Sequence, residues 1–599
     1  MLERSDLAEN ALACLHDEGY AAPFDTRDLN ASRWLFTGGR TGFSLNGDWR
    51  FCVDPTDAGL RQKWFAMEPI AAEDRPEPWD WDPFAGETVP VPSCWQTLRE
   101  RWFHYEGSAW YARDIEPAAL PRGERLFLRI GAAAYDCKVF LNGHFLGSHR
   151  GASTPFVVEI TGRLNEGSNL LLLCVNNDRR PDRVPMQNTD WFNYGGLHRE
   201  VEVFATPRAV IRDLFVRLVP NGRFDTIAVS AELEGAAGEA VLRIPGLGIE
   251  QTVRPGADGW AHAEIAARPE LWAPGHPVLY DVTLDWSADR VADRVGFREV
   301  RRAGTDILLN GRPFFLRGIS VHEDDAESGR VCTSEDLARR FDHAAELGCN
   351  FLRLAHYPHH EAAGRMADER GVLLWEEVPV YWSIDFANPA TLADARNQLA
   401  ELIRRDRNRA SVAIWSVGNE NPDTDARLAF MGALVETARS LDGTRLVSAA
   451  CLVNHARLTI EDRLAERLDI IGINEYYGWY EEDFEDLARI GANANPDRPV
   501  VITETGADAA IGPGAPTCGL FSEAYQAEVY RRQIETLDAL PYVKGVSPWI
   551  LYDFRAERRQ NVFQRGWNRK GLIAQDKATR KAAFALLADW YARIAARGA

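Results

Sequence analysis

The stretch Ser411-Val-Ala-Ile-Trp-Ser-Val-Gly-Asn-Glu420 joins an apolar run to a charged end. A second stretch, Pro499-Val-Val-Ile-Thr-Glu504, has the same form. Both runs predict fully buried strands, as in a parallel sheet that is covered on both faces. A carboxylate at the end of such a strand is costly unless it has a function, and catalytic groups collect at the carboxyl ends of barrel strands. Glu420 and Glu504 are therefore the predicted catalytic pair, suited to acid/base and nucleophilic chemistry at an acetal carbon.

Around these two runs, strand-like and helical patterns alternate over residues 301–599. The predicted strands are Pro313–Ser320, Asn350–His356, Val372–Pro379, Val412–Val417, Leu446–Cys451, Ile470–Asn474, Val500–Glu504 and Val543–Trp549. Helical periodicity covers Ser334–Gly348, Leu392–Arg404, Glu523–Leu540 and Thr579–Ile594. Ser334, with Asp336 after it, is the expected N-cap of the first helix. The pattern predicts a C-terminal (β/α)8 TIM barrel, with a doubly wound sheet as the alternative.

The residues before the barrel are rich in short strands and turns. We expect an N-terminal extension with a short helix over residues 1–40 and a jelly-roll β-sandwich over 41–205. An immunoglobulin-like β-sandwich is expected over 206–300. Lys138-Val-Phe-Leu141, followed by the turn Asn142-Gly143, is typical of the hairpins in such sheets. The predicted class is therefore a multidomain β plus α/β protein.

Composition limits the range of partners. The chain has 599 residues and a formal net charge of −20, which argues against nucleic acid or an anionic membrane as the main partner. Its nine cysteines show no paired CxxC spacing, and the N-terminus lacks a signal-peptide pattern, so we expect a cytoplasmic protein. No HExxH, P-loop or dinucleotide-binding fingerprint occurs, and we expect no metal ion and no cofactor.

Several motifs resemble glycoside hydrolase family 2 over roughly residues 43–590. They are Leu45-Asn-Gly-Asp-Trp49, Val91-Pro-Ser-Cys-Trp95, Asn310-Gly-Arg-Pro313, Arg353-Leu-Ala-His356 and Ile414-Trp-Ser-Val-Gly-Asn-Glu420. The resemblance implies a carbohydrate substrate and a retaining mechanism, in which Glu504 is the nucleophile and Glu420 the acid/base. Asn419, a neutral donor beside Glu420, is suited to a sugar 2-hydroxyl. A homo-oligomer is a further expectation from the family.

Four segments are similar to those of β-glucuronidases within this family. They are Asp190-Trp-Phe-Asn-Tyr-Gly-Gly196, His322-Glu-Asp324, Asn474-Glu-Tyr-Tyr-Gly-Trp-Tyr480 and Asn568-Arg-Lys570. The resemblance implies that Asn568 and Lys570 grip the sugar carboxylate, because residues two apart in an extended segment point the same way. It also places Asp190 at sugar hydroxyls, reaching from the jelly roll. His322, Tyr476 and Trp549 would line the pocket, and His356 would support the nucleophile region.

A basic loop agrees with an anionic sugar, although some positions depart from the β-glucuronidase pattern. Its six cations are Arg555, Arg558, Arg559, Arg565, Arg569 and Lys570, against one acid, Glu557. Thr505 stands where an aromatic residue is common, Glu475 where a basic residue often stands, and Gln564 where a carboxylate-binding arginine is expected, with Arg565 next to it. We therefore expect an exo-acting retaining β-glucuronidase. A β-galactosidase or another family 2 β-glycosidase, including a β-galacturonidase, is the alternative, and a non-catalytic carbohydrate-binding protein is a remote one.

Overall fold

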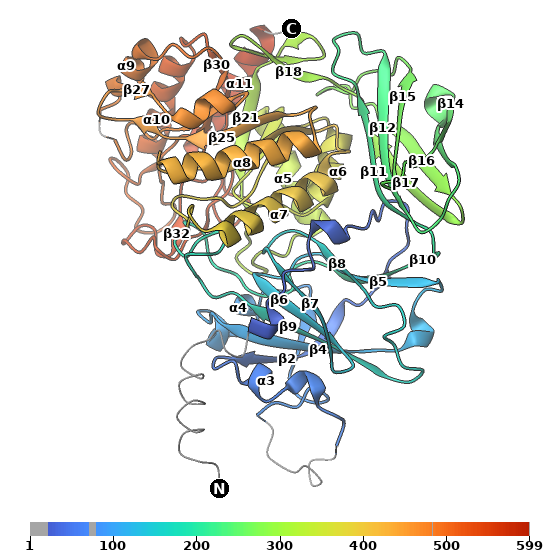
Figure 1. Ribbon diagram of the computed structural model, residues 1–599. Coiled ribbons are helices and arrows are strands. Elements are labelled where there is room, and N and C mark those ends of the chain that lie inside the picture. Colours follow the sequence, from blue (N-terminus) through green and yellow to red (C-terminus); the bar gives the residue numbers. More distant parts are fainter. Residues whose placement is uncertain (1–21, 71–79, 482, 598–599) are drawn as a thin grey trace. The chain divides into compact units, whose positions relative to one another are not determined.

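The computed structural model describes residues 22–70, 80–481 and 483–597 (Figure 1). Their contacts divide them into two compact units. The first comprises the described chain up to Arg179, with Asn193–Val210 and Gly329–Val331. The second comprises Arg180–Phe192, Ile211–Ser328 and the described chain from Cys332 onward.

The first unit is a β-sandwich of two antiparallel sheets. Six strands lie in the order β3-β2-β4-β9-β6-β7 and four in the order β1-β10-β5-β8. The strands are β1 Phe43–Ser44, β2 Gly47–Asp54, β3 Thr88–Val91, β4 Ser108–Ile115, β5 Arg125–Ile130, β6 Asp136–Leu141, β7 His144–Arg150, β8 Phe156–Glu159, β9 Asn169–Asn176 and β10 Val201–Thr206. Fully buried side chains from both sheets, such as Trp49, Leu173, Leu128 and Val203, form its core.

Turn residues and the start of the described chain also belong to this sandwich. Asn142 and Gly143, with φ of 50° and 78°, make the predicted turn between β6 and β7. The predicted extension lies outside the described residues over 1–21. From residue 22 on, it contains two short 3-10 helices, η1 Ala22–Phe24 and η2 Ala31–Arg33, and its Leu29 is buried in the core of the sandwich.

The second unit begins with a smaller sandwich. One sheet has the order β11-β12-β15 and the other the order β14-β13-β16-β17. The strands are β11 Val210–Leu218, β12 Thr226–Glu234, β13 Ala240–Ile244, β14 Ile249–Val253, β15 Trp260–Ala266, β16 Tyr280–Trp286 and β17 Asp289–Val295. Val229, Leu242, Leu284 and Val291 are among its buried residues.

A closed parallel barrel of eight strands follows, which confirms the predicted fold class. Its strands are β21 Leu316–Val321, β22 Phe351–Leu354, β23 Leu373–Glu377, β24 Val412–Asn419, β25 Leu446–Cys451, β28 Ile471–Asn474, β29 Val500–Glu504 and β30 Val543–Val546. Its helices are α5 Ser334–Leu347, α6 Ala362–Arg370, α7 Pro389–Asp406, α8 Asp425–Leu441, α9 Glu485–Asn493, α10 Glu523–Leu537 and α11 Ala582–Arg597. All eight predicted strands are present, several of them shorter than the apolar runs that predicted them.

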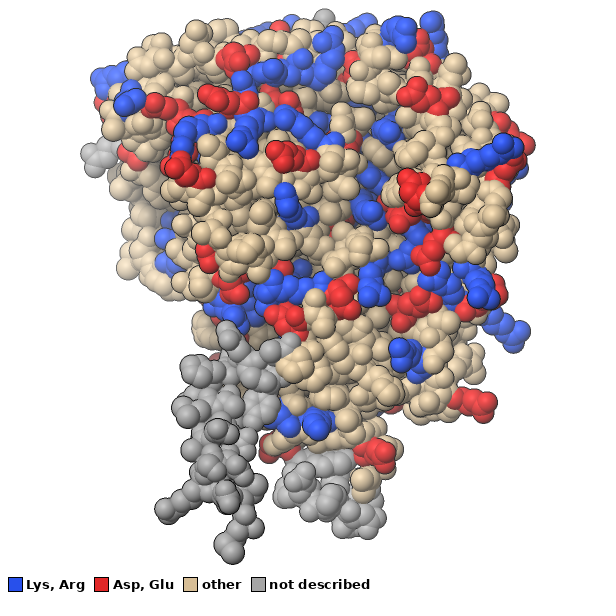
Figure 2. Space-filling view, in the orientation of Figure 1, with Lys and Arg blue, Asp and Glu red and all other residues tan. Residues whose placement is uncertain are grey.

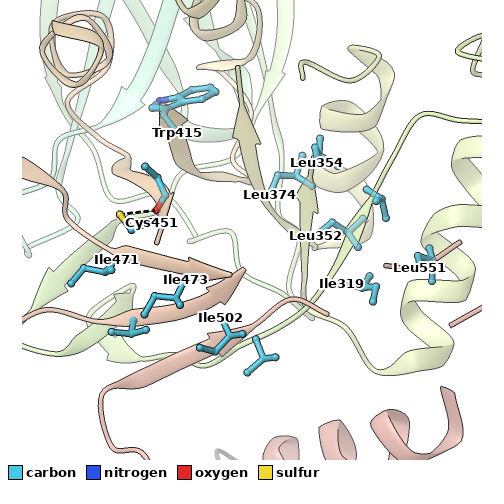
Figure 3. Packing of buried hydrophobic residues seen from close by; sticks show 14 of the residues in the cluster. Ile319, Leu352, Leu354, Leu374, Trp415, Cys451, Ile471, Ile473, Ile502 and Leu551 are labelled. Carbon is cyan, nitrogen blue, oxygen red and sulfur yellow. Dashed lines mark hydrogen bonds between the residues drawn. The ribbon is translucent and has the colours of Figure 1, made fainter. Parts of the chain in front are cut away.

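Apolar side chains between the strands and these helices form the largest core. Leu352, Leu374 and Ile502 on the strands belong to one buried cluster with Phe341 of α5 and Leu434 of α8. Figure 3 shows part of this layer, with side chains contributed by successive strands. Strands that are buried on both faces read as continuous apolar runs, which is why their pattern was visible in the sequence.

The predicted N-cap of α5 was wrong by one residue. Thr333 is the N-cap, with extended backbone, and its hydroxyl accepts a hydrogen bond from the Asp336 N–H at 3.1 Å. The Asp336 carboxylate accepts in return from the Thr333 N–H at 3.1 Å, completing a capping box. Ser334 is the first helical residue instead, because the reciprocal bonds need a spacing of three.

A small sheet covers the end of the barrel where the strands begin. It consists of β18 Val300–Ala303, β19 Asp306–Leu309 and β20 Arg312–Pro313. Ile307 and Leu309 pack in one cluster with residues at or near the starts of the barrel strands: Leu316, Phe351, Leu373, Ile414, Leu446 and Val501. The carboxyl ends of the strands therefore form the mouth that can hold a site.

Arg298 anchors the segment that leads into this sheet. Its buried guanidinium donates hydrogen bonds to the carbonyl oxygens of Ala410 at 3.0 Å, Thr444 at 3.2 Å and Val412. Burial lowers its pKa well below the usual range, so its positive charge is held there at a cost. Its removal would take this donor from the carbonyl oxygens of Ala410 and Thr444, whereas that of Val412 also accepts from Arg445 Nε at 3.2 Å.

We expect Arg298→Met to lower the apparent thermal midpoint by several degrees, because unsatisfied buried acceptors cost about 1–3 kcal/mol each. Calorimetry of the variant measures the shift. Arg312→Met is the matched control, because Arg312 is exposed on β20 of the same small sheet. Equal midpoints for the two variants would contradict the anchoring role.

Candidate active site

Polar side chains gather where adjacent barrel strands end. Asn419 is the last residue of β24, with Glu420 directly after it, and Asn474 and Glu504 end β28 and β29. Glu377 ends β23. Asn474 and Glu504 are partners in the strand register, so their side chains start from neighbouring positions at the mouth.

Arg353 joins these strand ends. It lies on β22, its side chain is fully buried, and its Nη1 donates to Glu504 Oε1 at 2.8 Å. Its Nη2 donates to Glu377 Oε1 at 3.0 Å and to Asn419 Oδ1 at 2.8 Å. Burial would raise the pKa of Glu377, but Arg353 and His356 outweigh it and lower that pKa to about 2. One guanidinium therefore fixes two carboxylates and an amide.

The other oxygen of Glu504 has a different donor. The Tyr476 hydroxyl donates to Glu504 Oε2 at 2.6 Å, and His356 Nε2 lies 3.6 Å from Oε1. His356 Nδ1 is 2.8 Å from Glu377 Oε1. The carboxylate of Glu504 is thus held in a single orientation by groups on two strands or the loops that follow them, as a nucleophile requires.

Glu420 accepts its hydrogen bonds from neutral side chains. Trp382 Nε1 donates to its Oε2 at 2.6 Å, and Asn474 Nδ2 donates to its Oε1 at 2.9 Å. Burial raises the pKa of Glu420 and the charge of Glu504 raises it further, so that it reaches about 7 although both hydrogen bonds lower it. A carboxyl group that keeps its proton near neutral pH can act as a general acid.

The backbone at Glu420 is in the left-handed region, with a φ of 50°. Such a conformation costs about 1–3 kcal/mol outside glycine and is common at functional sites. The Glu420 N–H donates to the Ala450 carbonyl at 2.9 Å, which holds the residue in place. The backbone at the end of β24 thus fixes the position from which the Glu420 side chain starts.

Asn419 presents one donor without a protein partner. Its Oδ1 accepts from Arg353 and, at 3.2 Å, from Asn474 Nδ2, which fixes the orientation of the amide. Its buried Nδ2 has no hydrogen-bond partner among the described residues. A buried N–H group that lacks a partner can donate a hydrogen bond to a hydroxyl of a bound ligand.

Aromatic rings surround the nucleophile. The ring of His356 stacks on Trp549 with centroids 4.8 Å apart, and His322 meets the same indole edge-on at 5.1 Å. Trp191 lies 5.5 Å from His356. The structure therefore brings the predicted residues His322, His356, Tyr476 and Trp549 to one wall of the mouth.

The predicted carboxylate grip is arranged differently from the expectation. Lys570 Nζ donates to Asp508 at 2.7 Å and to the Tyr480 hydroxyl at 2.8 Å. Burial would lower the pKa of Lys570, but Asp508 outweighs it and raises it. Asn568 Nδ2 donates instead to Asp190 at 3.1 Å. The two side chains thus already have separate acidic partners.

Asp190 and Arg565 also differ from the sequence picture. Asp190 belongs to the segment Arg180–Phe192, which is part of the second unit together with the barrel. Arg559 donates to both of its oxygens, at 2.9 and 2.6 Å. Arg565 is exposed, and its Nε donates to the Val562 carbonyl at 2.9 Å.

Sequence reasoning assigned no role to Trp382, Asn474 or Arg353, and it included Arg559 only as one cation of the basic loop. Asn474 could have been found, because it ends a barrel strand as Asn419 and Glu504 do. Trp382 lies in a loop and no local pattern marks it. The described residues contain no cluster of three or more His, Cys, Asp or Glu side chains arranged for a metal ion.

A (β/α)8 barrel in which a carboxylate bound by an arginine lies beside a carboxyl group whose pKa is raised to about 7 is the arrangement of a glycoside hydrolase. Residues 43–207 match the sugar binding domain, and residues 299–595 the TIM barrel domain, of glycosyl hydrolases family 2. The chain belongs to glycoside hydrolase family 2.

Similar proteins cover nearly the whole chain. The β-glucuronidase of Paenibacillus borealis is 28% identical over 595 residues, covering 91% of this chain and 96% of that protein. Human β-glucuronidase is 27% identical over 610 residues, covering 92% and 91%. The structure of Ruminococcus gnavus β-glucuronidase in complex with D-glucuronic acid matches with a TM-score of 0.81 and 26% identity, covering 94% of this chain and all (100%) of that one. Bifidobacterium dentium β-glucuronidase, complexed with coumarin-3-O-glucuronide, matches with a TM-score of 0.81 and 27% identity over 92% and 97% of the chains.

We expect Trp382→Phe to move the basic limb of the pH profile of kcat/KM to higher pH. The indole N–H stabilises the ionised form of Glu420, so its loss raises the pKa above about 7 and keeps the acid protonated further. The profile is measured with a 4-nitrophenyl glycoside. Trp260→Phe in the smaller sandwich is the control, and a limb that stays or moves to lower pH would contradict the assignment.

Proposed function

We propose that the protein is an exo-acting retaining β-glucuronidase that hydrolyses β-D-glucuronides by double displacement. The observation that carries the proposal is a carboxylate pair in two environments, with a buried lysine at the same mouth. The similarity to β-glucuronidases, which covers 91% of the chain in one relative and 94% in one solved structure, supports the choice of sugar.

In the first step a Glu504 oxygen attacks the anomeric carbon, and the bond from that carbon to the leaving oxygen breaks. Arg353 and Tyr476 hold Glu504 for this attack. Glu420 gives its proton to the leaving oxygen, so the aglycone departs as a neutral alcohol. Asn419 Nδ2 donates to the 2-hydroxyl, a contact that strengthens as positive charge develops on the ring.

In the second step Glu420, now ionised, takes a proton from water. The water oxygen bonds to the anomeric carbon, and the ester bond to Glu504 breaks. Glu504 leaves as a carboxylate that Arg353 again stabilises. Each glutamate thus returns to its initial protonation state after one turnover.

Lys570 and Asn568 are the proposed ligands of the sugar carboxylate. Lys570 is buried, and the nearby loop supplies further cations in a chain of net charge −20, which reduces the repulsion of an anionic substrate. On the face shown in Figure 2, basic and acidic side chains are intermingled. That mixture fits a small carbohydrate substrate better than nucleic acid.

The second candidate is a β-galactosidase or another family 2 β-glycosidase, including a β-galacturonidase. The observation that favours a neutral sugar is that Lys570 already pairs with Asp508 and Arg559 with Asp190. A site whose cations are balanced can bind a neutral ring through its hydroxyls. The two candidates share the mechanism and differ only in the sugar.

We also propose a cytoplasmic location. All cysteines among the described residues are free, which fits a reducing compartment. None of the described helices is long and apolar enough to cross a membrane. Assembly into a homo-oligomer stays a prediction, which light scattering coupled to gel filtration would measure.

We expect the wild type to cleave 4-nitrophenyl β-D-glucuronide in preference to the galacturonide, galactoside, glucoside and mannoside. Lys570→Gln should lower kcat/KM for the glucuronide on the order of 100-fold, because hydrogen bonds to charged groups contribute about 1.5–3 kcal/mol. Adding Asp508→Asn removes the buried charge that this change leaves unpaired. Lys544→Gln is the control. Lys544 lies on β30, at the opposite end of the barrel from the mouth, and forms an ion pair with Asp306 of β19. Preferential cleavage of the galactoside would select the second candidate.

We expect a 2-deoxy-2-fluoro glucuronyl fluoride to label Glu504 covalently. The fluorine at C2 slows breakdown of the glycosyl-enzyme, and the fluoride leaving group keeps its formation faster than its breakdown, so the labelled enzyme accumulates. Peptide mass spectrometry locates the label. Glu504→Gln should abolish labelling, whereas Glu420→Gln should retain it, because the fluoride needs little help from an acid. A wild type that turns over substrate without trapping would contradict the retaining mechanism.

A further inference from the structure

A two-stranded hairpin carries an additional arginine close to the proposed ligands of the sugar carboxylate. Its strands are β31 Phe554–Arg555 and β32 Trp567–Asn568, and Arg559 lies in the loop between them. The Nε and Nη2 of Arg559 donate side-on to the two oxygens of Asp190, whose side chain is only 10% exposed. A bidentate pair of this kind fixes the plane of the guanidinium.

Arg559 and Lys570 lie beside the same ring. Arg559 Cζ is 5.8 Å from the centroid of Tyr480, and Lys570 Nζ is 4.7 Å from it. The positive charge of Arg559 acts to lower the pKa of Lys570, although Asp508 outweighs this effect, so the two cations are near enough to interact. An anion placed between them would relieve that repulsion.

The fork of Arg559 is only partly used by the protein. A guanidinium has five N–H donors, and Asp190 takes those on one edge. Nη1 makes no hydrogen bond to another described residue. The pair with Asp190 thus orients the group while leaving donors for a ligand.

We propose that Arg559 is a specificity-determining residue that binds the carboxylate of the uronic acid together with Lys570. This inference rests on the proposed β-glucuronidase function. Asp190 orients Arg559 and balances its charge when the pocket is empty. A sugar with a hydroxymethyl group in place of the carboxylate gains little from two cations, so Arg559 increases the discrimination between the two sugars. The competing explanation is that Arg559 only holds Asp190 for contacts to sugar hydroxyls.

The test compares 4-nitrophenyl β-D-glucuronide with the β-D-glucoside, which differs only at C6. Arg559→Gln should lower kcat/KM for the glucuronide on the order of 100-fold and change that for the glucoside less than about threefold. Arg559→Lys, which keeps the charge and loses the fork, should give an intermediate loss for the glucuronide. Inhibition by D-glucuronate should weaken in the same variants as kcat/KM for the glucuronide falls. This measurement reports binding of the carboxylate and does not depend on the chemical step.

Arg531→Gln is the matched control, because Arg531 lies on the exposed side of α10 and pairs with Glu528 and Glu535. Thermal midpoints show whether the variants fold. If Arg559→Gln does not fold, the comparison of the two sugars is made with Arg559→Lys. Parallel losses on both sugars, or no loss on either, would overturn the role of Arg559. A wild type that cleaves another glycoside and not the glucuronide would overturn the proposed function instead.

Discussion

The buried guanidinium of Arg353 is the interaction on which the site depends. It contacts Glu504, Glu377 and Asn419 at once, and these lie on three different strands. A cation in the barrel interior is costly unless its charge is balanced, and removal of one partner of such a pair leaves a buried charge uncompensated. The carboxylates therefore hold Arg353 as much as Arg353 holds them. Its fully buried position also makes the geometry of the mouth a property of the barrel rather than of mobile loops.

The same arrangement gives the two glutamates different hydrogen-bond donors. Glu504 accepts a hydrogen bond from the cationic side chain of Arg353, whereas the donors to Glu420 are the neutral side chains of Trp382 and Asn474. The negative charge retained on Glu504 then adds to the burial of Glu420 in raising its pKa. Two identical side chains acquire different properties because a single cation lies beside only one of them.

Sequence patterns predicted what is local and periodic. The eight barrel strands could be found because each is a short apolar run, and Glu420, Asn419 and Glu504 because they stand where such runs stop. The N-cap at Thr333 was missed by one residue because the choice depends on reciprocal hydrogen bonds. Trp382 and Arg559 lie in loops, whose paths are set by packing against distant segments. The expectation that Asn568 and Lys570 converge on one carboxylate rested on the resemblance and on backbone alternation, neither of which indicates that Asp190 and Asp508 also bind these side chains.

The sheet β18-β19-β20 gives the barrel a closed base, and this has a kinetic consequence. Because described apolar side chains of this sheet pack against the starts of the strands, we expect whatever reacts with the proposed glycosyl-enzyme to arrive through the mouth by which the aglycone left. Water and alcohols must then compete for one vacated position beside Glu420. The partition between hydrolysis and transfer to a new acceptor depends on which molecule occupies that position during the lifetime of the intermediate. Acceptor concentration, rather than a separate water channel, would decide whether the protein degrades glycosides or synthesises them.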